Sequence, residues 1–214
     1  MQQLRRSQWE VLNNMSSKMD IWNTALSHLG ISKEVASVDE SSAEAKACRR
    51  FYDTTIKAVL KDYSWPFASK IATLNLITAN PNDEWAYSYR YPSDCLFFRR
   101  ILSGNRNDTE ATKIPYAVSQ DASALVIYTD AVSAQGEYTV NITDESYFAS
   151  DFVLAVSYRL AYYMAARLTA GDPFKLGPAA MQNYMIELSR AKANSFNEDQ
   201  SVTLQDTESI AARN

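Results

Sequence analysis

Glycine is scarce in this sequence. The 214-residue chain has five glycines, where an average usage of about 7% would give about 15. None is spaced as in a Walker phosphate-binding loop or a dinucleotide-binding turn, and no Gly-x-Ser-x-Gly nucleophile elbow is present. These absences exclude the commonest nucleotide-binding and hydrolase motifs, and no cofactor is expected.

Histidine and cysteine are scarcer still. Any Ser-His-Asp or Cys-His site would have to use the single histidine, His28, whose place at the end of a predicted helix favours a capping or surface role. Two separated cysteines, Cys48 and Cys95, cannot complete a tetrahedral zinc site with one histidine. They are also too few for a disulfide framework. No catalytic or metal-binding residue is therefore assigned.

Carboxylate pairs are harder to exclude, because glycan hydrolysis needs only two acids about 5–9 Å apart. The chain has 25 acidic residues, and Asp39-Glu40 and Asp144-Glu145 are adjacent pairs. Both pairs precede predicted helices, which favours N-terminal capping over catalysis. A hydrolase acting through a carboxylate pair stays open as an alternative.

Long apolar runs and an excess of positive charge are also missing. The longest apolar stretch, from Phe152 to Leu168, is interrupted by Arg159 and Arg167, so no membrane span is expected. The net charge of −4 argues against free nucleic acid as the main partner. Tyrosine, by contrast, is abundant at 13 residues, and tyrosine is enriched at protein interfaces.

Two helices are predicted before residue 67. The first covers about Lys18 to Leu29, with Gly30 at the position of a C-terminal glycine cap. The second begins at a capping box formed by Ser41 and Glu44. Its outer face carries the basic residues Lys46, Arg49 and Arg50. A solvated face is the simpler interpretation of these cations, and contact with an acidic neighbouring subunit is the other.

Two further helices are predicted after residue 143. The first follows an Asp144 cap, from about Glu145 to Ala170, and is apolar on nearly all sides. Such a helix is either central in its own fold or covered by a partner. The last helix runs from Pro178 to about Phe196.

Between residues 68 and 143 the period changes to two. Trp85, Tyr87, Tyr89 and Tyr91 alternate with smaller or polar residues, which predicts a strand with one aromatic face. That face packs within the protein or stacks on a sugar or base. Five or six short antiparallel strands are expected, separated by turns at residues 80–83, 104–108 and 134–136. A strand through Arg99 and Arg100 can point only one of them inward.

The sequence therefore predicts an α+β fold: a bundle of about four helices with an inserted antiparallel β region. Residues 1–67 form the N-terminal helical part, 68–143 the β region, 144–196 the helices that complete the bundle, and 197–214 an extended polar tail. The tail cannot form a core of its own. We expect it to bind a partner through the small apolar anchors Val202, Leu204 and Ile210, with Phe196, the residue just before it, as a further partner-binding residue.

Several segments in this order resemble the tail tubular protein A family, the head-to-tail adaptors of short-tailed bacteriophages. The most specific are Trp65-Pro66-Phe67-Ala68 and Tyr91-Pro92-Ser93-Asp94-Cys95. The resemblance covers about residues 19–195 and rests on hydrophobic, structural segments. It implies a virion protein, made in the host cytoplasm, that forms a ring of twelve subunits at the portal vertex.

The resemblance implies a structural protein without enzymatic activity. Its partners would be the portal protein, the tail nozzle protein and neighbouring copies of itself, and DNA would pass through the lumen without specific binding. The net negative charge suits such a channel wall. The alternatives are the glycan or peptidoglycan hydrolase of the tail, and a small head-completion or stopper protein of a long-tailed phage.

Overall fold

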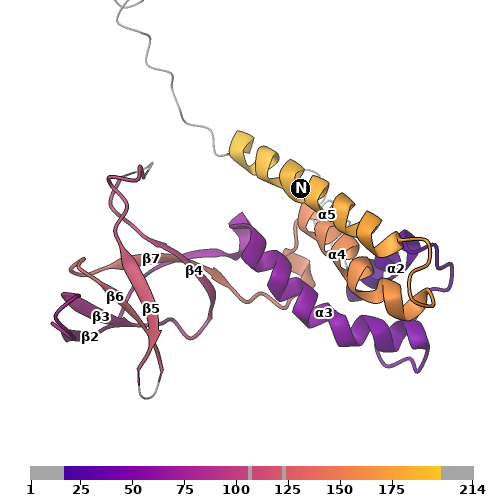
Figure 1. The fold of residues 1–214 in the computed structure, drawn as a ribbon, viewed down its shortest axis with the longest axis horizontal. Helices are drawn as coiled ribbons and strands as arrows, with labels where there is room; N and C mark the ends of the chain where they lie inside the picture. The colour runs from indigo at the N-terminus through magenta and orange to yellow at the C-terminus, as the bar shows by residue number, and fades with distance from the viewer. Residues whose placement is uncertain (1–16, 106–107, 122–123, 199–214) are drawn as a thin grey trace, which may run out of the picture.

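The computed structural model describes residues 17–105, 108–121 and 124–198. These residues form the predicted α+β fold, with four α-helices and two antiparallel sheets arranged as two lobes side by side (Figure 1). The helices belong to one lobe and the strands to the other. The helices are α2 (Lys18–His28), α3 (Ala43–Asp62), α4 (Ser150–Leu168) and α5 (Leu176–Glu198).

Helix α4 is the centre of the helical lobe. It packs against α2, α3 and α5, and its side chains Phe152, Leu160 and Met164 are completely buried. The nearly all-round apolar character of this segment therefore reflects a central place in its own fold. The predicted fourth helix is confirmed as α5, which buries Tyr184 and Leu188.

The caps of α2 follow from its sequence. The Ser17 hydroxyl accepts a hydrogen bond from the Asp20 amide (3.2 Å), and the Asp20 carboxylate accepts one from the Ser17 amide (3.0 Å), so a capping box starts the helix. At the other end, Gly30 has φ +70° and the Ile31 amide donates to the carbonyl oxygen of Leu26. This is the predicted glycine cap, in the Schellman form.

Two predicted helix starts were wrong in detail. Helix α3 is capped by Ser42, whose hydroxyl accepts from the Ala45 amide, and not by Ser41. Asp144 caps only the short 3-10 helix η2 (Glu145–Tyr147), and α4 begins at Ser150. For α3 two adjacent serines offered the same local signal, whereas the N-cap of α4 is Ala149, whose side chain makes no capping hydrogen bond.

The β lobe holds seven strands among the described residues, where five or six were expected. The difference arises because the segment from Ser69 to Ala79 divides near Leu74 and supplies strands to two sheets. One sheet has the order β1-β7-β4 and the other β2-β3-β6-β5. The strands are β1 (Ser69–Thr73), β2 (Leu76–Ala79), β3 (Tyr87–Arg90), β4 (Cys95–Ile101), β5 (Tyr116–Gln120), β6 (Leu125–Thr129) and β7 (Gln135–Val140).

Gly136 was expected in a turn, but the structure places it in β7. A Cβ atom at Gly136 would lie 2.5 Å from Cε2 of Phe98, so the absence of a side chain makes room for that ring. Phe98 packs with Tyr89 and Tyr138 in the core of the β lobe. Tyr89 is buried there, so the predicted aromatic face packs within the protein.

The β lobe is an insertion between α3 and α4. The chain enters it through η1 (Pro66–Ala68) and β1, and leaves it through β7. Strands β1 and β7 are paired, with Ser69 opposite Thr139, so the entering and leaving chains lie next to each other.

Candidate interaction surfaces

The joint between the two lobes is built around Arg99. From β4, its Nη2 donates to the carbonyl oxygens of Leu60 (2.9 Å) and Tyr63 (2.8 Å), and its Nε donates to the hydroxyl of Thr139 (2.9 Å). The two carbonyls belong to the end of α3, where helices leave acceptors unpaired. Its guanidinium also lies 4.6 Å from the ring centre of Phe97. A cation from the β lobe thus caps a helix of the other lobe.

Arg100, the next residue, points to a different set of partners. Its Nε donates to the Glu137 carboxylate (2.7 Å), and its Nη1 donates to the Asp108 carboxylate (3.0 Å). Only Arg99 of the two reaches the helical lobe, in keeping with the alternation expected of a strand. The hydrogen bond to Glu137 raises the pKa of Arg100, because it favours the charged form.

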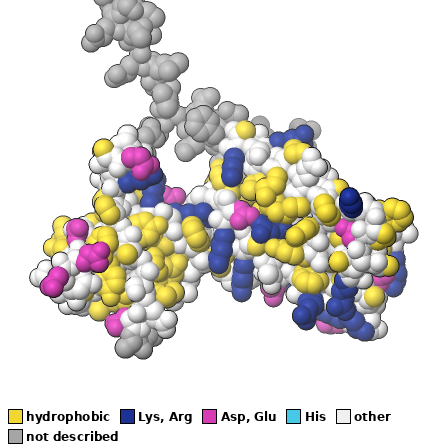
Figure 2. All heavy atoms as spheres, in the orientation of Figure 1, with side chains coloured by type: hydrophobic (Ala, Val, Ile, Leu, Met, Phe, Trp, Pro, Cys, Tyr) yellow, Lys and Arg dark blue, Asp and Glu magenta, His cyan; other side chains and the backbone are white. Residues whose placement is uncertain are grey.

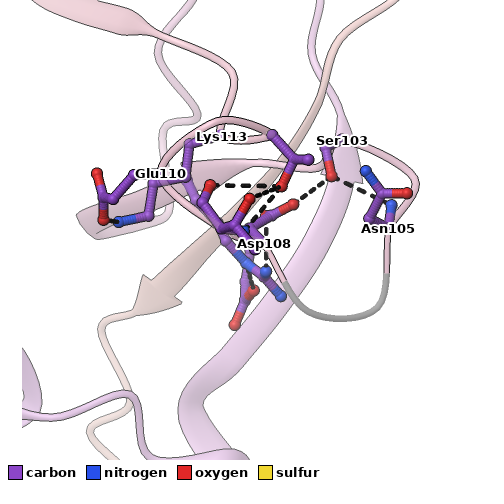
Figure 3. Close-up of polar contacts among 9 residues, drawn as sticks. Ser103, Asn105, Asp108, Glu110 and Lys113 are labelled. Carbon is purple, nitrogen blue, oxygen red and sulfur yellow. Dashed lines mark hydrogen bonds and ion pairs between the residues drawn. The ribbon is translucent and has the colours of Figure 1, made fainter.

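The segment that follows β4 forms a projecting arm (Figure 1). The hydroxyl of Ser103 donates to Asp108, and Lys113 forms an ion pair with Glu110 at 2.5 Å (Figure 3). The amide of Asn105 donates to Ser103 Oγ at 3.1 Å. The sequence predicted a plain turn for residues 104–108. The structure adds that Arg100 and Ser103 anchor its end through Asp108, so the base of the arm has a defined conformation.

A polar cluster lies where α3, α4 and α5 meet. Arg159 donates to the Asp62 carboxylate and, at 3.0 Å, to the hydroxyl of Tyr184, which itself donates to Asp62 at 2.6 Å. Burial lowers the pKa of Arg159, but its hydrogen bonds to Tyr163 and Tyr184 outweigh burial, and the pKa is raised overall. Burial raises the pKa of Tyr184. The cluster holds three helices together and keeps its charge balanced.

His28 lies in the last turn of α2, at the helix end where it was expected, but it is half-buried and not on the surface. Its ring stacks on Tyr158 with 3.8 Å between ring centres, and its Nε2 lies 3.1 Å from Ser157 Oγ. It therefore joins α2 to α4. Burial lowers the pKa of His28, so the neutral form is favoured.

The carboxylate pairs considered for catalysis are engaged in local structure. Asp144 accepts hydrogen bonds from the hydroxyl and from the amide of Ser146, and these lower its pKa. Glu145 accepts from the hydroxyl of Tyr52 at 3.1 Å. Glu40 accepts from the amide of Ala36 and its pKa is also lowered, chiefly by the hydroxyl of Ser42. The pair Asp39-Glu40 therefore stabilises the loop before α3 and does not cap the helix.

A pocket of about 270 Å³ lies between the β1–β2 and β3–β4 connections. Asp94, in the turn that enters β4 as expected, forms an ion pair with Lys70 at 2.6 Å and accepts from the hydroxyl of Tyr138 at 3.1 Å. The hydrogen bond from Lys70 is the main cause that lowers the pKa of Asp94. Asp94 is thus held as a carboxylate, which is the opposite of what a general acid requires.

Exposed apolar side chains mark both lobes. On α5, Met185 and Ile186 are 51% and 43% exposed and line a shallow hollow on its outer face. On the edge strand β2, Leu76 and Ile77 are 55% and 42% exposed. Figure 2 shows hydrophobic side chains gathered on the visible face of each lobe. Apolar surface of this kind is typical of contacts with other proteins.

The predicted anchors of the polar tail can be placed only in part. Phe196 falls within α5. Val202, Leu204 and Ile210 lie outside the described residues.

The three basic residues predicted on the outer face of the second helix are exposed on α3, and Arg49 donates to the carbonyl oxygen of Glu40 at 3.1 Å. Sequence reasoning had not identified the partners of Arg99, and only the alternation with Arg100 hinted at them.

The sequence matches no protein-family model, and no curated protein is similar to it at a significant level. Within the described ranges, no group of three or more potential metal ligands comes together. No helix in the described part of the chain is long and apolar enough to cross a membrane.

Proposed function

We propose that this protein is a structural head-to-tail adaptor of a phage virion, located in the tail at the portal vertex. Twelve copies form a ring that joins the portal to the tail nozzle and continues the DNA channel. The proposal takes its identity from the resemblance of residues 19–195 to the tail tubular protein A family. It takes its physical support from the shape and surface of the subunit.

The observation that carries the proposal is a firmly joined two-lobed subunit with apolar side chains exposed on both lobes. Arg99 ties the β lobe to the end of α3. Met185 on α5 and Leu76 on β2 are more than half exposed. Different apolar surfaces on the two lobes suit a heterologous contact, in which one surface of a subunit binds a different surface of the next. Contacts of this kind generate closed rings when the rotation between subunits closes.

The charges of the described acids favour a structural role over hydrolysis. Asp94, Asp144 and Glu40 all have lowered pKa values, so each is held as an anion. A glycoside hydrolase needs one acid whose pKa is raised, so that it can protonate the leaving group. Asp94, Asp144 and Glu40 are therefore unsuited to the role of that proton donor.

The proposal is tested by the mass of the purified protein in solution, measured by light scattering alone and after mixing with the portal protein of the same phage. We expect a defined ring of about 12 subunits to form on the portal, with a central channel in negative-stain images. A monomer that does not bind the portal would contradict the proposal.

The hydrolase alternative has its own test. Adaptor freed of other tail proteins is assayed in a zymogram containing purified cell wall. We expect no clearing. Clearing that disappears when one acid is changed to its amide would favour the hydrolase.

A further inference from the structure

Helix α3 carries a row of cations without an acidic partner among the described residues. Lys46, Arg50, Lys57 and Lys61 are exposed and follow one another at intervals of four, seven and four residues. At 100° and 1.5 Å per residue, these positions lie along a single stripe about 22 Å long. Asp53 is an exposed acid within it. We call the four cations the basic stripe; Figure 2 shows lysine and arginine side chains along the lower edge of the helical lobe, where α3 runs.

The outer end of the β lobe carries the opposite charge. Asp83 and Glu84 are exposed in the connection between β2 and β3, and neither has a basic partner in the described part of the chain. Asp130 lies next to them, because its Oδ1 accepts a hydrogen bond from the Ala86 amide at 2.9 Å. We call Asp83, Glu84 and Asp130 the acidic tip. Figure 2 shows acidic side chains gathered at this end.

The two surfaces cannot neutralise each other within one subunit. The strands β2 and β3 that carry the tip lie at the end of the β lobe farthest from the helices (Figure 1). The basic stripe lies on the outer face of α3, in the other lobe. Each surface therefore carries a net charge that the other does not neutralise within one subunit.

The acidic tip also borders apolar surface, because Val132 is 71% exposed and follows Asp130 by two residues. Beside the basic stripe, Lys57 lines a polar pocket of about 140 Å³ together with Asp53 and Glu145, and the apolar residues of its wall, Ile56 and Phe148, are buried. The match between the two surfaces is therefore one of complementary charge, which steers association and fixes register at protein interfaces.

We propose that the basic stripe of one subunit binds the acidic tip of the next subunit in the ring. This inference rests on the proposed function and names the contact by which the subunits associate. The occupant of the stripe is a second copy of this chain because the chain itself supplies the matching unpaired acids. Duplex DNA is the rival ligand for a row of cations, and the net charge of −4 disfavours it.

Charge reversal on each side tests the contact. One variant carries Lys46→Glu and Arg50→Glu, a second carries Asp83→Lys and Glu84→Lys, and a third combines all four changes. Assembly is followed by mass photometry as a function of concentration, alone and with the portal protein. We expect each variant changed on one side only to need at least about tenfold more protein than the wild type for half-maximal assembly. The variant with all four changes should assemble at a concentration close to that of the wild type, because its reversed charges again attract each other.

A matched control reverses two exposed cations elsewhere, Arg167→Glu and Lys175→Glu, which changes the net charge by the same amount as the first variant. It should assemble like the wild type. Circular dichroism melts establish that every variant is folded. Raising sodium chloride from about 50 to about 500 mM should weaken wild-type assembly, because salt screens such contacts.

Three outcomes would overturn the inference while leaving the proposed function intact. In the first, the variants changed on one side only assemble as well as the wild type. In the second, the variant with all four changes is folded but assembles no better than the variants with two. In the third, Lys46→Glu with Arg50→Glu weakens binding to a duplex oligonucleotide, measured by fluorescence anisotropy, and leaves assembly unchanged. Failure of the wild type to assemble, with or without portal, would instead remove the proposed function and the inference with it.

Discussion

Arg99 donates a hydrogen bond from Nη2 to the main-chain oxygen of Leu60, 39 residues earlier in the sequence, at 2.9 Å. This single contact joins a strand of one lobe to the terminal turn of a helix in the other. Its other bonds, to Tyr63 and Thr139, fix the guanidinium from two more sides. The relative position of the lobes is therefore held by this half-buried cation together with the apolar contacts that Leu96 and Val140 make with the helical core.

Replacing Arg99 should destabilise the protein. Arg99→Ala removes charge-assisted hydrogen bonds and leaves carbonyls at the end of α3 unpaired, so we expect the free energy of unfolding to fall by about 2–4 kcal/mol. Arg99→Lys should lose less, because it keeps the charge but not the planar fork. Urea unfolding measures both. Arg90→Ala, at an exposed arginine of β3, is the control and should change stability by less than about 0.5 kcal/mol.

Adding a methyl group at Gly136 should also destabilise the β lobe. A Cβ there would lie 2.5 Å from the ring of Phe98. That ring is buried and packs edge-on against the ring of Tyr116, with 5.0 Å between the two ring centres. Overpacking of this kind costs about 1–3 kcal/mol. In a double-mutant cycle with Phe98→Leu, the combined cost should be smaller than the sum of the single costs, because the smaller side chain frees the space. Strict additivity would contradict the proposed clash.

The pKa of His28 should lie below its ordinary value of 6.5, because burial against Tyr158 disfavours the imidazolium. The unfolded chain then binds the proton more readily than the folded one. The histidine's contribution to stability is fully present above pH 6.5 and is lost as the pH falls through the folded pKa. Since His28 is the only histidine, a nuclear magnetic resonance titration of its ring gives the value directly. A pKa at or above 6.5 would contradict the burial that we describe.

Tyr184→Phe should weaken the helical lobe. The hydroxyl bridges Asp62 and Arg159, so removing it leaves both ions short of a partner. We expect a loss of about 1–2 kcal/mol in the free energy of unfolding. Tyr158→Phe removes a hydroxyl that makes no hydrogen bond to any described residue and keeps the ring that stacks on His28. Equal effects of the two substitutions would show that the bridge contributes little.

The helices and their buried faces were largely predictable. The intervals between apolar residues placed α2, α3 and α5. Of the two interpretations of the all-round apolar segment, the central helix is the one that is confirmed. The alternation of Tyr87 and Tyr89 with polar residues predicted β3. These patterns succeed because they report which side of one element is buried, and that depends on neighbours close in the sequence.

Details that depend on distant residues were not predictable. Whether Ser41 or Ser42 caps α3 depends on how the preceding loop packs. The place of Gly136 in a strand depends on a ring that lies 38 residues earlier in the chain. Two of the three hydrogen-bond partners of Arg99 are main-chain oxygens, which leave no mark in the sequence. The candidate interaction surfaces could be predicted only to the same extent. A row of cations in the sequence predicts a charged face, but it does not identify the acids that bind there.

The pairing of β1 with β7 has a consequence for how this protein can diversify. Because Ser69 lies opposite Thr139, the polypeptide departs from the helical bundle and returns to it at almost the same point. Everything beyond that pair is joined to the bundle by these two adjacent chain segments and by the hydrogen bonds of Arg99. The outer strands of a segment inserted in this way can be lengthened, shortened or exchanged with little change to the packing of its host. A change in the acidic tip would, by contrast, require a matching change in the basic stripe.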